Sequence, residues 1–236
     1  ADKFMCKPSH HIIRFDNVSF SYSEDKVLFQ NLSLGITPGT IYHITGPSGA
    51  GKSTFLRLII RLEEPIQGQI LFKGAPLHDT YPPHLRRAIL YLPQKPVAMD
   101  GSVKDHLLLP FMFKTNQDLQ KPDDAHLKEE LKKFLLDDVR LDDHAQTLSV
   151  GQLQRLCFIR GMLLSPSVLL LDEPTSSLDT KSAAIVTDHI NMLCKTSGLT
   201  ALMVIHGDVL SKSLKYRSIM VGGGLVREIS GIRELA

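Results

Sequence analysis

A glycine-rich segment around residue 50 limits what this chain can fold into more than any other feature of its sequence. Gly46, Gly51, Lys52 and Ser53 follow the pattern G-x-x-x-x-G-K-S, directly after a predicted strand, Ile41–Thr45, and before apolar residues at helical spacing. Strand, loop and helix in this order are the context in which such a loop binds phosphate. The glycines let the backbone present its N–H groups in a concave nest, and the start of the helix adds a favourable dipole. We therefore predict a nucleoside triphosphate site.

The side chains of this loop have separate expected tasks. Lys52 would reach the β- and γ-phosphates, and the Ser53 hydroxyl would bind Mg²⁺. The residues expected to surround the phosphates are Gly46, Pro47, Ser48, Gly49, Ala50, Gly51, Lys52, Ser53 and Thr54. Kinases, GTPases and many ATPases share a loop of this kind, so the loop alone does not select among them.

Two carboxylates follow a second apolar segment. Val168–Leu171 predicts a buried parallel strand, and Asp172 and Glu173 come directly after it. Ligands of an open α/β sheet bind at the carboxyl ends of its strands, so we expect both acids beside the glycine-rich loop. Asp172 would bind Mg²⁺ directly or through water. Glu173 would orient or deprotonate the water that attacks the γ-phosphate. Without the loop, such a pair more often marks a strand leading into a solvated turn.

Apolar strands alternate with helical patterns along the chain, which predicts an α/β core with a mainly parallel sheet. Several short strands are predicted over 12–44, with others at Gln69–Lys73, Ala88–Leu92, Val168–Leu171, Thr200–Ile205 and Ser218–Val221. Helices are predicted at Lys52–Leu62, Val103–Leu109, Ala125–Leu136, Gly151–Leu164 and Lys181–Lys195. The helical middle, from about Lys95 to Leu164, indicates an inserted subdomain.

Composition and charge restrict the class of protein further. The chain has 236 residues, 43% of them apolar, which suits one large globular domain. Its 27 basic and 25 acidic residues nearly balance, so the strongly basic surface typical of nucleic-acid binding is not expected. No window approaches the ~18–20 apolar residues of a membrane span, and the N-terminus shows no signal-peptide pattern. The three cysteines, Cys6, Cys157 and Cys194, are widely spaced and are expected to be reduced thiols in a cytoplasmic protein.

Leu148–Gln152, with the sequence Leu-Ser-Val-Gly-Gln, begins the last helix of the middle region. Ser149 is a good N-cap for that helix and Gly151 permits close approach of a phosphate, so its start is a second candidate anion site. This segment, followed by the basic Arg155, resembles the signature of the ATP-binding cassette (ABC) ATPases, usually LSGGQ. It also stands in the expected place, between the glycine-rich loop and the acidic strand. A capped helix without a ligand is the alternative interpretation.

The resemblance covers essentially the whole chain and implies a site that two copies of the chain complete. In that family ATP and Mg²⁺ bind to the glycine-rich loop of one chain. Ser149, Gly151 and Gln152 of a second copy would then close over the nucleotide in an ATP-dependent head-to-tail dimer. Val150 stands where the family has glycine, and a β-branched residue tolerates positive φ poorly. Either this position needs no positive φ, which we favour, or the composite site closes less tightly.

Further residues resemble functional residues of the family. Gln94 resembles the glutamine that contacts Mg²⁺ and the attacking water, and His206 resembles the switch histidine that bonds the γ-phosphate. Asp179, in Ser177–Asp179, resembles the loop that crosses the dimer interface, and Tyr22 resembles the aromatic residue that stacks on adenine. Taken singly, each has an ordinary structural explanation as a polar loop residue, a strand-end histidine, a helix cap or a core residue.

The resemblance also implies an architecture. It predicts an α/β fold with a P-loop NTPase (RecA-like) core, an N-terminal antiparallel β-subdomain and an inserted α-helical subdomain. Residues 1–236 would form a single ABC ATPase domain. Residues 1–94 and 165–236 would form the nucleotide-binding core with its β-subdomain, and 95–164 the helical subdomain.

Transport is the function that the resemblance implies first. The chain would hydrolyse ATP at the inner face of the cell membrane, bound to an integral membrane permease that supplies the spans. The stretch after Gln94 and the C-terminal Arg233–Ala236 resemble the FetA-type iron-export ATPases, which implies export of metals such as iron or of stress-related compounds. The apolar run Leu107–Phe113 either frames a groove for a permease helix or packs inside the helical subdomain, and both can hold.

Two other classes of function fit the sequence less well. Soluble ABC ATPases that act on DNA or ribosomes typically carry long coiled-coil insertions or two fused cassettes, and this chain has neither. Its charge balance also argues against a nucleic-acid partner. A kinase or GTPase would leave Leu148–Gln152 unexplained, and the chain has no guanine-reading Asn-Lys-x-Asp pattern.

Overall fold

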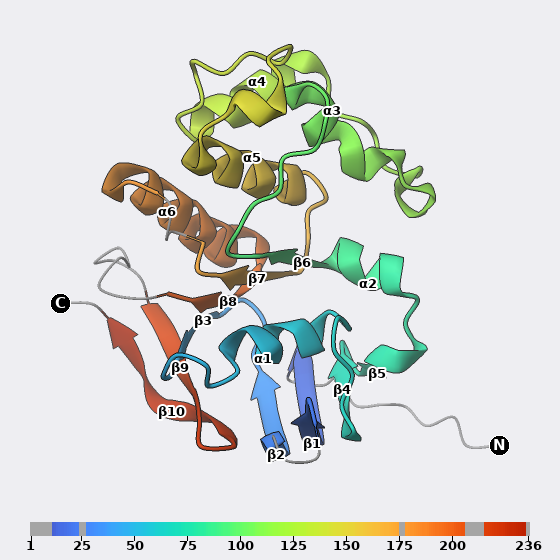
Figure 1. The fold of residues 1–236 in the computed structure, drawn as a ribbon, viewed down its shortest axis with the longest axis vertical. Helices are drawn as coiled ribbons and strands as arrows, with labels where there is room; N and C mark the ends of the chain where they lie inside the picture. Colours follow the sequence, from blue (N-terminus) through green and yellow to red (C-terminus); the bar gives the residue numbers. More distant parts are fainter. Residues whose placement is uncertain (1–10, 24–26, 175–177, 206–214, 235–236) are drawn as a thin grey trace.

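The computed structural model describes residues 11–23, 27–174, 178–205 and 215–234. Within them the strands form two sheets, and helix α1 (Lys52–Ile59) lies between the two (Figure 1). The smaller sheet is antiparallel, with the order β2-β1-β4-β5. It contains β1 (Ile13–Ser21), β2 (Val27–Ile36), β4 (Gln67–Phe72) and β5 (Ala75–Pro76). The larger sheet has the order β10-β9-β3-β8-β7-β6. It contains β3 (Ile41–Thr45), β6 (Ile89–Leu92), β7 (Val168–Asp172), β8 (Thr200–Val204), β9 (Lys215–Gly222) and β10 (Leu225–Glu234).

The larger sheet is parallel except where β10 pairs with β9. Every residue of β7 and β8 is buried, because helices cover both faces of these interior strands and continuous apolar runs suit that position. Alternate side chains enter different cores. Leu170 and Leu202 join the apolar cluster around α1, whereas Leu169 and Met203 join the cluster on the opposite face.

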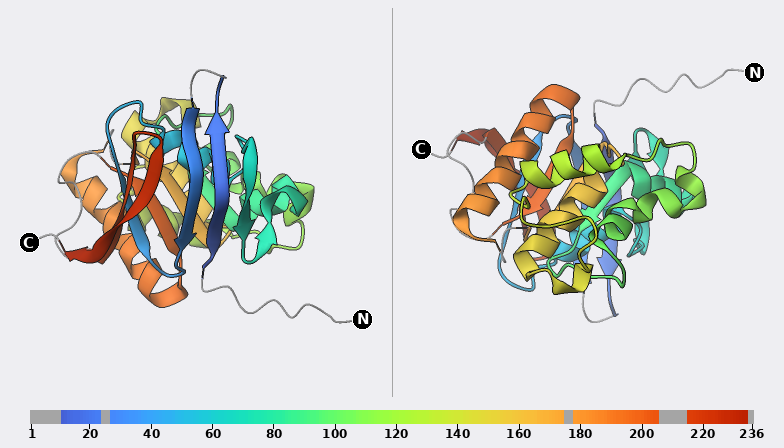
Figure 2. Two further views of the ribbon diagram at one scale, coloured as in Figure 1. Left: turned by 90° about the horizontal axis from the view of Figure 1, so that it is seen from below. Right: turned by 90° about the horizontal axis from the view of Figure 1, so that it is seen from above.

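Aromatic packing fixes α1 between the sheets. Phe55 of α1 stacks on Phe15 of β1 with ring centroids 5.0 Å apart, and meets Phe29 of β2 edge-on at 6.5 Å. Each fully buried side chain of this size contributes about 1.5–3 kcal/mol. The Gln30 N–H donates to the Gly224 carbonyl (3.2 Å), which joins the edge of the smaller sheet to the β9–β10 turn (Figure 2).

Helices cover the face of the larger sheet that is turned away from α1 (Figures 1 and 2). α5 (Val150–Met162) and α6 (Thr180–Ser197) pack on the sheet, and α3 (Val103–Leu108) and α4 (Asp124–Lys133) pack on α5. The N-caps of these four helices accept a hydrogen bond from a first-turn N–H: Ser102, Asp123, Ser149 and Asp179. The remaining helical segments are α2 (Pro82–Ala88), η1 (Leu77–Asp79), η2 (Leu109–Met112), η3 (Lys114–Asn116) and η4 (Ala145–Thr147).

The predicted fold class is confirmed, but some elements differ from the sequence prediction. α2, β5 and β10 are not predicted by the sequence pattern. α2 buries only Leu85, so it leaves no helical periodicity to detect. β10 carries adjacent charged residues, Arg227 and Glu228, beside a glycine-rich turn. The helix predicted at Lys52–Leu62 is also too long, because α1 ends at Ile59.

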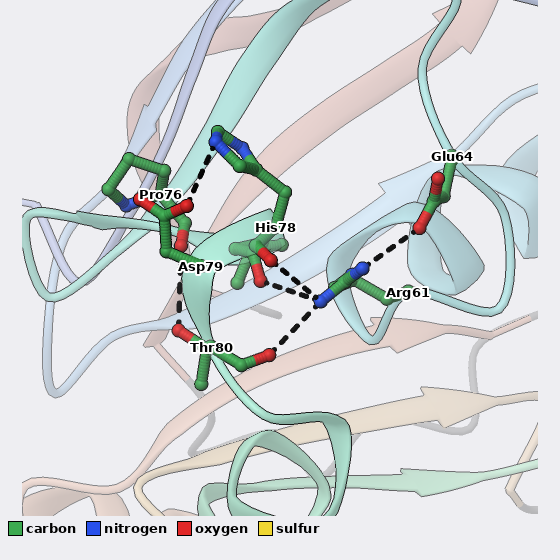
Figure 3. Close-up of polar contacts among 7 residues, drawn as sticks. Arg61, Glu64, Pro76, His78, Asp79 and Thr80 are labelled. Carbon is green, nitrogen blue, oxygen red and sulfur yellow. Dashed lines mark hydrogen bonds and ion pairs between the residues drawn. The ribbon is translucent and has the colours of Figure 1, made fainter.

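Arg61 stands two residues beyond the end of α1. Its φ is 55°, a left-handed conformation that glycine usually supplies just beyond a helix. Its side chain makes several contacts in return: Nη1 donates to the carbonyl oxygens of Leu77, His78 and Thr80 at 3.1, 3.2 and 3.0 Å (Figure 3). Nη2 lies 3.0 Å from the Glu64 carboxylate. Arg61 therefore fixes the end of α1 to the connection between β5 and α2.

Replacing Arg61 by methionine should lower the free energy of unfolding by about 1–3 kcal/mol, because three carbonyl groups lose their donor while the apolar stem remains. Glu64→Gln is the matched control, since it removes only the exposed charge partner and should cost about 0–1 kcal/mol. Urea unfolding measures both variants. Equal losses would contradict a stabilising role of the carbonyl contacts.

Candidate active site

The glycine-rich loop joins the carboxyl end of β3 to the start of α1. Gly46, Gly49 and Gly51 have φ values of 147°, 75° and 99°, which L side chains rarely adopt. Two of them also lack space for a side chain. A Cβ on Gly46 would lie 2.0 Å from the Val221 carbonyl oxygen, and one on Gly51 would lie 2.8 Å from the Leu28 side chain. Backbone conformation and close packing therefore both require glycine here.

The start of α1 is electropositive. Lys52 is buried, and its Nζ donates to the carbonyl oxygens of Gly46 and Pro47, each at 2.9 Å. No side chain among the described residues caps α1, and its first turn contains no acid. Its first backbone N–H groups and the Lys52 ammonium thus converge on the loop. This arrangement fits the phosphates of ATP.

The two acids lie at the carboxyl end of β7. Asp172 is buried, and its Oδ2 accepts a hydrogen bond from the Tyr91 hydroxyl at 3.1 Å. Glu173 has a φ of 53°, and its N–H donates to the Val204 carbonyl oxygen on β8 at 3.0 Å. A non-glycine residue in this conformation stores about 1–3 kcal/mol of strain, which is typical of functional sites.

Gln94 and Glu173 are brought together from segments far apart in the chain. Gln94 Nε2 donates to Glu173 Oε2 at 2.6 Å. The amide therefore orients the carboxylate that the sequence singles out as the partner of the attacking water. The oxygen atoms of Asp172, Gln94 and Ser53 are also ligands of the kind that Mg²⁺ prefers, so this set fits that cation.

Tyr91 is a site residue that the sequence does not reveal. Its hydroxyl donates to Asp172 and accepts a hydrogen bond from Arg57 on α1, so it links β7 to the helix of the glycine-rich loop. Burial raises the pKa of Tyr91, and the charge of Asp172 raises it further. The hydrogen bond that Arg57 donates to Tyr91 in turn raises the pKa of Arg57. The contact depends on the register of β6 against β7, which places Tyr91 opposite Leu170 and which no local pattern encodes.

Tyr22 lies beside the same helix. Its hydroxyl is 2.9 Å from Thr54 Oγ1 and donates to Glu63 Oε1 at 3.3 Å. Its ring meets Phe20 edge-on at 4.9 Å and is about half exposed. An aromatic face next to the start of α1 is compatible with stacking on a base, and the stacking itself remains a prediction.

The signature segment lies elsewhere. Ser149 caps α5, accepting from the Gln152 N–H at 3.2 Å, while Gln152 Oε1 accepts from the Ser149 N–H at 2.9 Å. Val150 is helical and exposed, so in this structure its position needs no positive φ. α5 packs on the opposite face of the larger sheet from α1. One chain therefore does not bring Ser149, Gly151 and Gln152 to its own glycine-rich loop.

A buried contact ties the signature helix to the loop expected at the dimer interface. Arg155 Nη1 donates to Ser182 Oγ at 2.5 Å, and Ser182 Oγ donates to Asp179 Oδ2 at 2.7 Å. Asp179 Oδ1 also accepts from the Ser182 N–H at 3.0 Å. Burial lowers the pKa of Arg155, and the hydrogen bonds from Ser182 lower the pKa of Asp179. The role of Ser182 could not be predicted from the sequence pattern, because Ser182 is an ordinary polar residue of a helix.

Two residues of the predicted site, His206 and Ser177, lie outside the described residues. The strand end before His206 is described, and the Ile205 carbonyl oxygen lies 3.1 Å from Nε2 of His43 on β3.

Comparison with known proteins identifies the family. The sequence pattern of the ABC transporter family matches residues 29–176. The chain belongs to the ABC transporter family. Its members are ATPases coupled to transport and bind ATP, generally with Mg²⁺, so this chain is an ATPase of that class. The family predicted from Leu148–Gln152 and the glycine-rich loop is thereby confirmed.

Individual relatives of this ABC ATPase include transport proteins of different lengths. It is 33% identical over 195 residues to the "Probable iron export ATP-binding protein FetA" of Escherichia coli (strain K12), covering 83% of this chain and 84% of that protein. The solved structure of a bacterial Atm1-family ABC exporter with ATP bound has a TM-score of 0.76 and 26% identity, over 97% of this chain and 41% of that one. CbiO1 from Clostridium perfringens, at 23% identity and a TM-score of 0.74 over 93% of this chain and 88% of its own, shares the fold.

Several other relatives are much longer than the ABC ATPase. The chain spans between 14% and 53% of seven further curated relatives. Among the described residues, no helix has both the length and the apolar character of a membrane span.

Substitution of Ser182 by alanine should lower the free energy of unfolding of the ABC ATPase by about 1–3 kcal/mol, because the buried Arg155 guanidinium loses its acceptor. Ser197→Ala, at the exposed end of the same helix, is the control and should stay within about 0.5 kcal/mol of the wild type. Both values come from urea unfolding. If the two variants behave alike, the buried bridge does not stabilise the protein.

Proposed function

We propose that this chain is the ATP-binding subunit of an ABC exporter, and that two copies of it drive a separate integral membrane permease. The separation of the two halves of the site supports the need for two copies, and the likeness to FetA over 84% of that protein supports the role as an exporter subunit. Lys52 begins α1, and Asp172 is linked to α1 through Tyr91 and Arg57. The exposed Ser149 instead begins α5, which packs on the other face of the larger sheet. A second copy in head-to-tail orientation would supply the missing half.

The proposed roles of the residues follow from their chemistry. Lys52 and the loop N–H groups hold the phosphates, and Ser53, Gln94 and Asp172 are the proposed ligands of Mg²⁺. Mg²⁺, when bound, neutralises charge on the phosphate oxygens. Glu173, oriented by Gln94, accepts the proton of the attacking water.

The other proposed contacts reach the base, the γ-phosphate and the second chain. Tyr22 stacks on adenine, and His206 bonds the γ-phosphate. Asp179 faces the second chain, whose Ser149, Gly151 and Gln152 close over the nucleotide.

The division into subdomains is retained as part of the proposal, with residues 1–94 and 165–236 as the core and 95–164 as the helical subdomain. The packing of α3 and α4 on α5 supports it, because it joins these helices to one another.

Glu173→Gln should reduce ATP hydrolysis by about 10²–10⁴-fold, since the carboxylate that accepts the proton is lost while the phosphate contacts remain. ATP binding should persist, and size-exclusion chromatography with ATP and Mg²⁺ should show a dimer. Glu129→Gln, on the exposed face of α4, is the matched control and should hydrolyse ATP at the normal rate. Normal hydrolysis by Glu173→Gln would disprove the assigned role.

The permease surface is proposed at the apolar run Leu107–Phe113. Leu107 and Phe111 are buried in the helical region, but Met112 and Phe113 are 67% and 54% exposed. The run thus packs inside the helical region at one side and presents apolar side chains at the other. Arg87 of α2 binds the chain just beyond the run, at the Thr115 carbonyl oxygen (3.1 Å) and the Asp118 carboxylate (2.9 and 3.0 Å). The exposed pair is of the kind that contacts a partner helix.

Changing Met112 and Phe113 to aspartate together should abolish co-purification of the chain with its permease and leave ATP hydrolysis by the isolated chain unchanged. Ile66→Asp, at an exposed apolar position in the other part of the molecule, is the control and should retain the permease. If the double variant still co-purifies with the permease, the docking surface does not include Met112 and Phe113. Recovery of ribosomal or DNA-repair proteins without any integral membrane protein would reject the transport proposal.

For the cargo we propose metal ions, iron included, or stress-related compounds. The support is the likeness to FetA, which extends over 84% of that protein. Deletion of the gene should raise the iron content of cells grown in excess iron, measured by elemental analysis. An unchanged content of iron and other metals would reject metal export.

A further inference from the structure

The strand that leads to Gln94 brings a second side chain to the acidic end of β7. β6 pairs with β7 in parallel, and their register sets Tyr91 opposite Leu170 (Figure 1). Side chains alternate along a strand, so Asp172 projects from the same face of the sheet as Leu170. Leu170 belongs to the apolar cluster around α1, and Tyr91 packs against that cluster. Tyr91 and Asp172 therefore lie on one face of the sheet, on neighbouring strands.

The hydroxyl of Tyr91 has one favoured orientation. It donates to Asp172 Oδ2 at 3.1 Å, because an ionised carboxylate can only accept. On its other side it accepts from the Arg57 guanidinium, which can only donate. Both neighbours thus require the O–H bond to point at Asp172. Asp172 is 6% exposed, so little water competes for its oxygen atoms.

Tyr91 and Gln94 contact the two acids separately. Gln94 Nε2 donates to Glu173, and Tyr91, three residues earlier, donates to Asp172. The last torsion of an aspartate side chain is broad, so a donor on one oxygen restricts the plane of the carboxylate. A restricted carboxylate presents its other oxygen in one direction. Side chains that orient a metal ligand in this way typically change metal affinity by about 10–100-fold.

We propose that Tyr91 is a positioning residue of the Mg²⁺ site. Its hydroxyl fixes the plane of the Asp172 carboxylate, and that orientation sets how tightly the site holds the cation together with the nucleotide. Tyr91 acts only through Asp172. The inference rests on the proposed function, in which Asp172 is a ligand of Mg²⁺. It adds a determinant of metal affinity on β6, outside the glycine-rich loop and outside the acidic pair.

Calorimetry with the non-hydrolysable analogue adenylyl imidodiphosphate tests this role without turnover. The dissociation constant is measured in EDTA and again in saturating Mg²⁺, and the ratio of the two values gives the contribution of the metal. Tyr91→Phe keeps the ring and removes only the hydroxyl. The ratio should therefore fall about tenfold, while the dissociation constant in EDTA stays within about twofold of wild type. Tyr81→Phe, which removes the hydroxyl of an exposed tyrosine, is the matched control and should keep the ratio.

A second substitution tests whether Tyr91 acts through Asp172. Asp172→Asn should lower the ratio at least as far as Tyr91→Phe does. Adding Tyr91→Phe to Asp172→Asn should then change the ratio by less than about twofold, because the carboxylate on which the hydroxyl acts is already gone.

The outcomes separate this inference from the proposed function. An unchanged ratio in Tyr91→Phe, with or without weaker binding in both solutions, overturns the inference and leaves Asp172 as the proposed ligand. A further tenfold fall in the double variant also overturns it. A wild-type ratio in Asp172→Asn rejects Asp172 as a ligand of Mg²⁺, and the inference falls with it.

Discussion

Unpaired backbone donors at the start of α1 are the constraint around which the rest of the structure is arranged. An α-helix begins with N–H groups that no intrahelical carbonyl can satisfy, and in α1 no described side chain takes their place. They remain available to an anion because the exposed loop at Pro47–Gly49 leaves them open. Two other contacts fix the position of the helix. Phe55 stacks on Phe15 of the smaller sheet, and Arg61, beyond the C-terminal end of α1, donates to the Leu77 carbonyl oxygen. A rigid helix keeps the donors aimed at one place.

The local sequence was sufficient to predict a site residue wherever the role of that residue depends on its neighbours in the chain. The glycines of Gly46–Thr54 could be found because the loop conformation needs them at fixed spacing. Asp172 and Glu173 could be found because a buried strand must end somewhere, and in an α/β sheet its carboxyl end is where ligands bind. The family and fold class predicted from these segments were confirmed by comparison with known proteins.

Contacts between distant segments could not be predicted in this way. The hydroxyl of Tyr91 meets Asp172 only because β6 pairs with β7 in one particular register. Ser182 matters because α6 lies alongside α5, so that it can join Arg155 to Asp179. The helix was predicted to continue to Leu62 because Arg61 is not a residue that usually ends a helix. Arg61 nevertheless adopts the left-handed conformation that glycine usually supplies there, and its side chain makes hydrogen bonds in that position. Each of these depends on packing, which is set by the whole chain.

The position of β3 in the larger sheet has a consequence for how the protein is made. β3 and its loop come early in the chain, yet the strands on either side of β3 are β8 and β9, which come late. Gly46 itself fits against the carbonyl oxygen of Val221 at the end of β9. During translation β3 therefore has no neighbouring strand in its sheet until the residues of β8 and β9 have left the ribosome. A translation product that stops before β9 carries every residue of the glycine-rich loop but lacks the strand against which Gly46 packs.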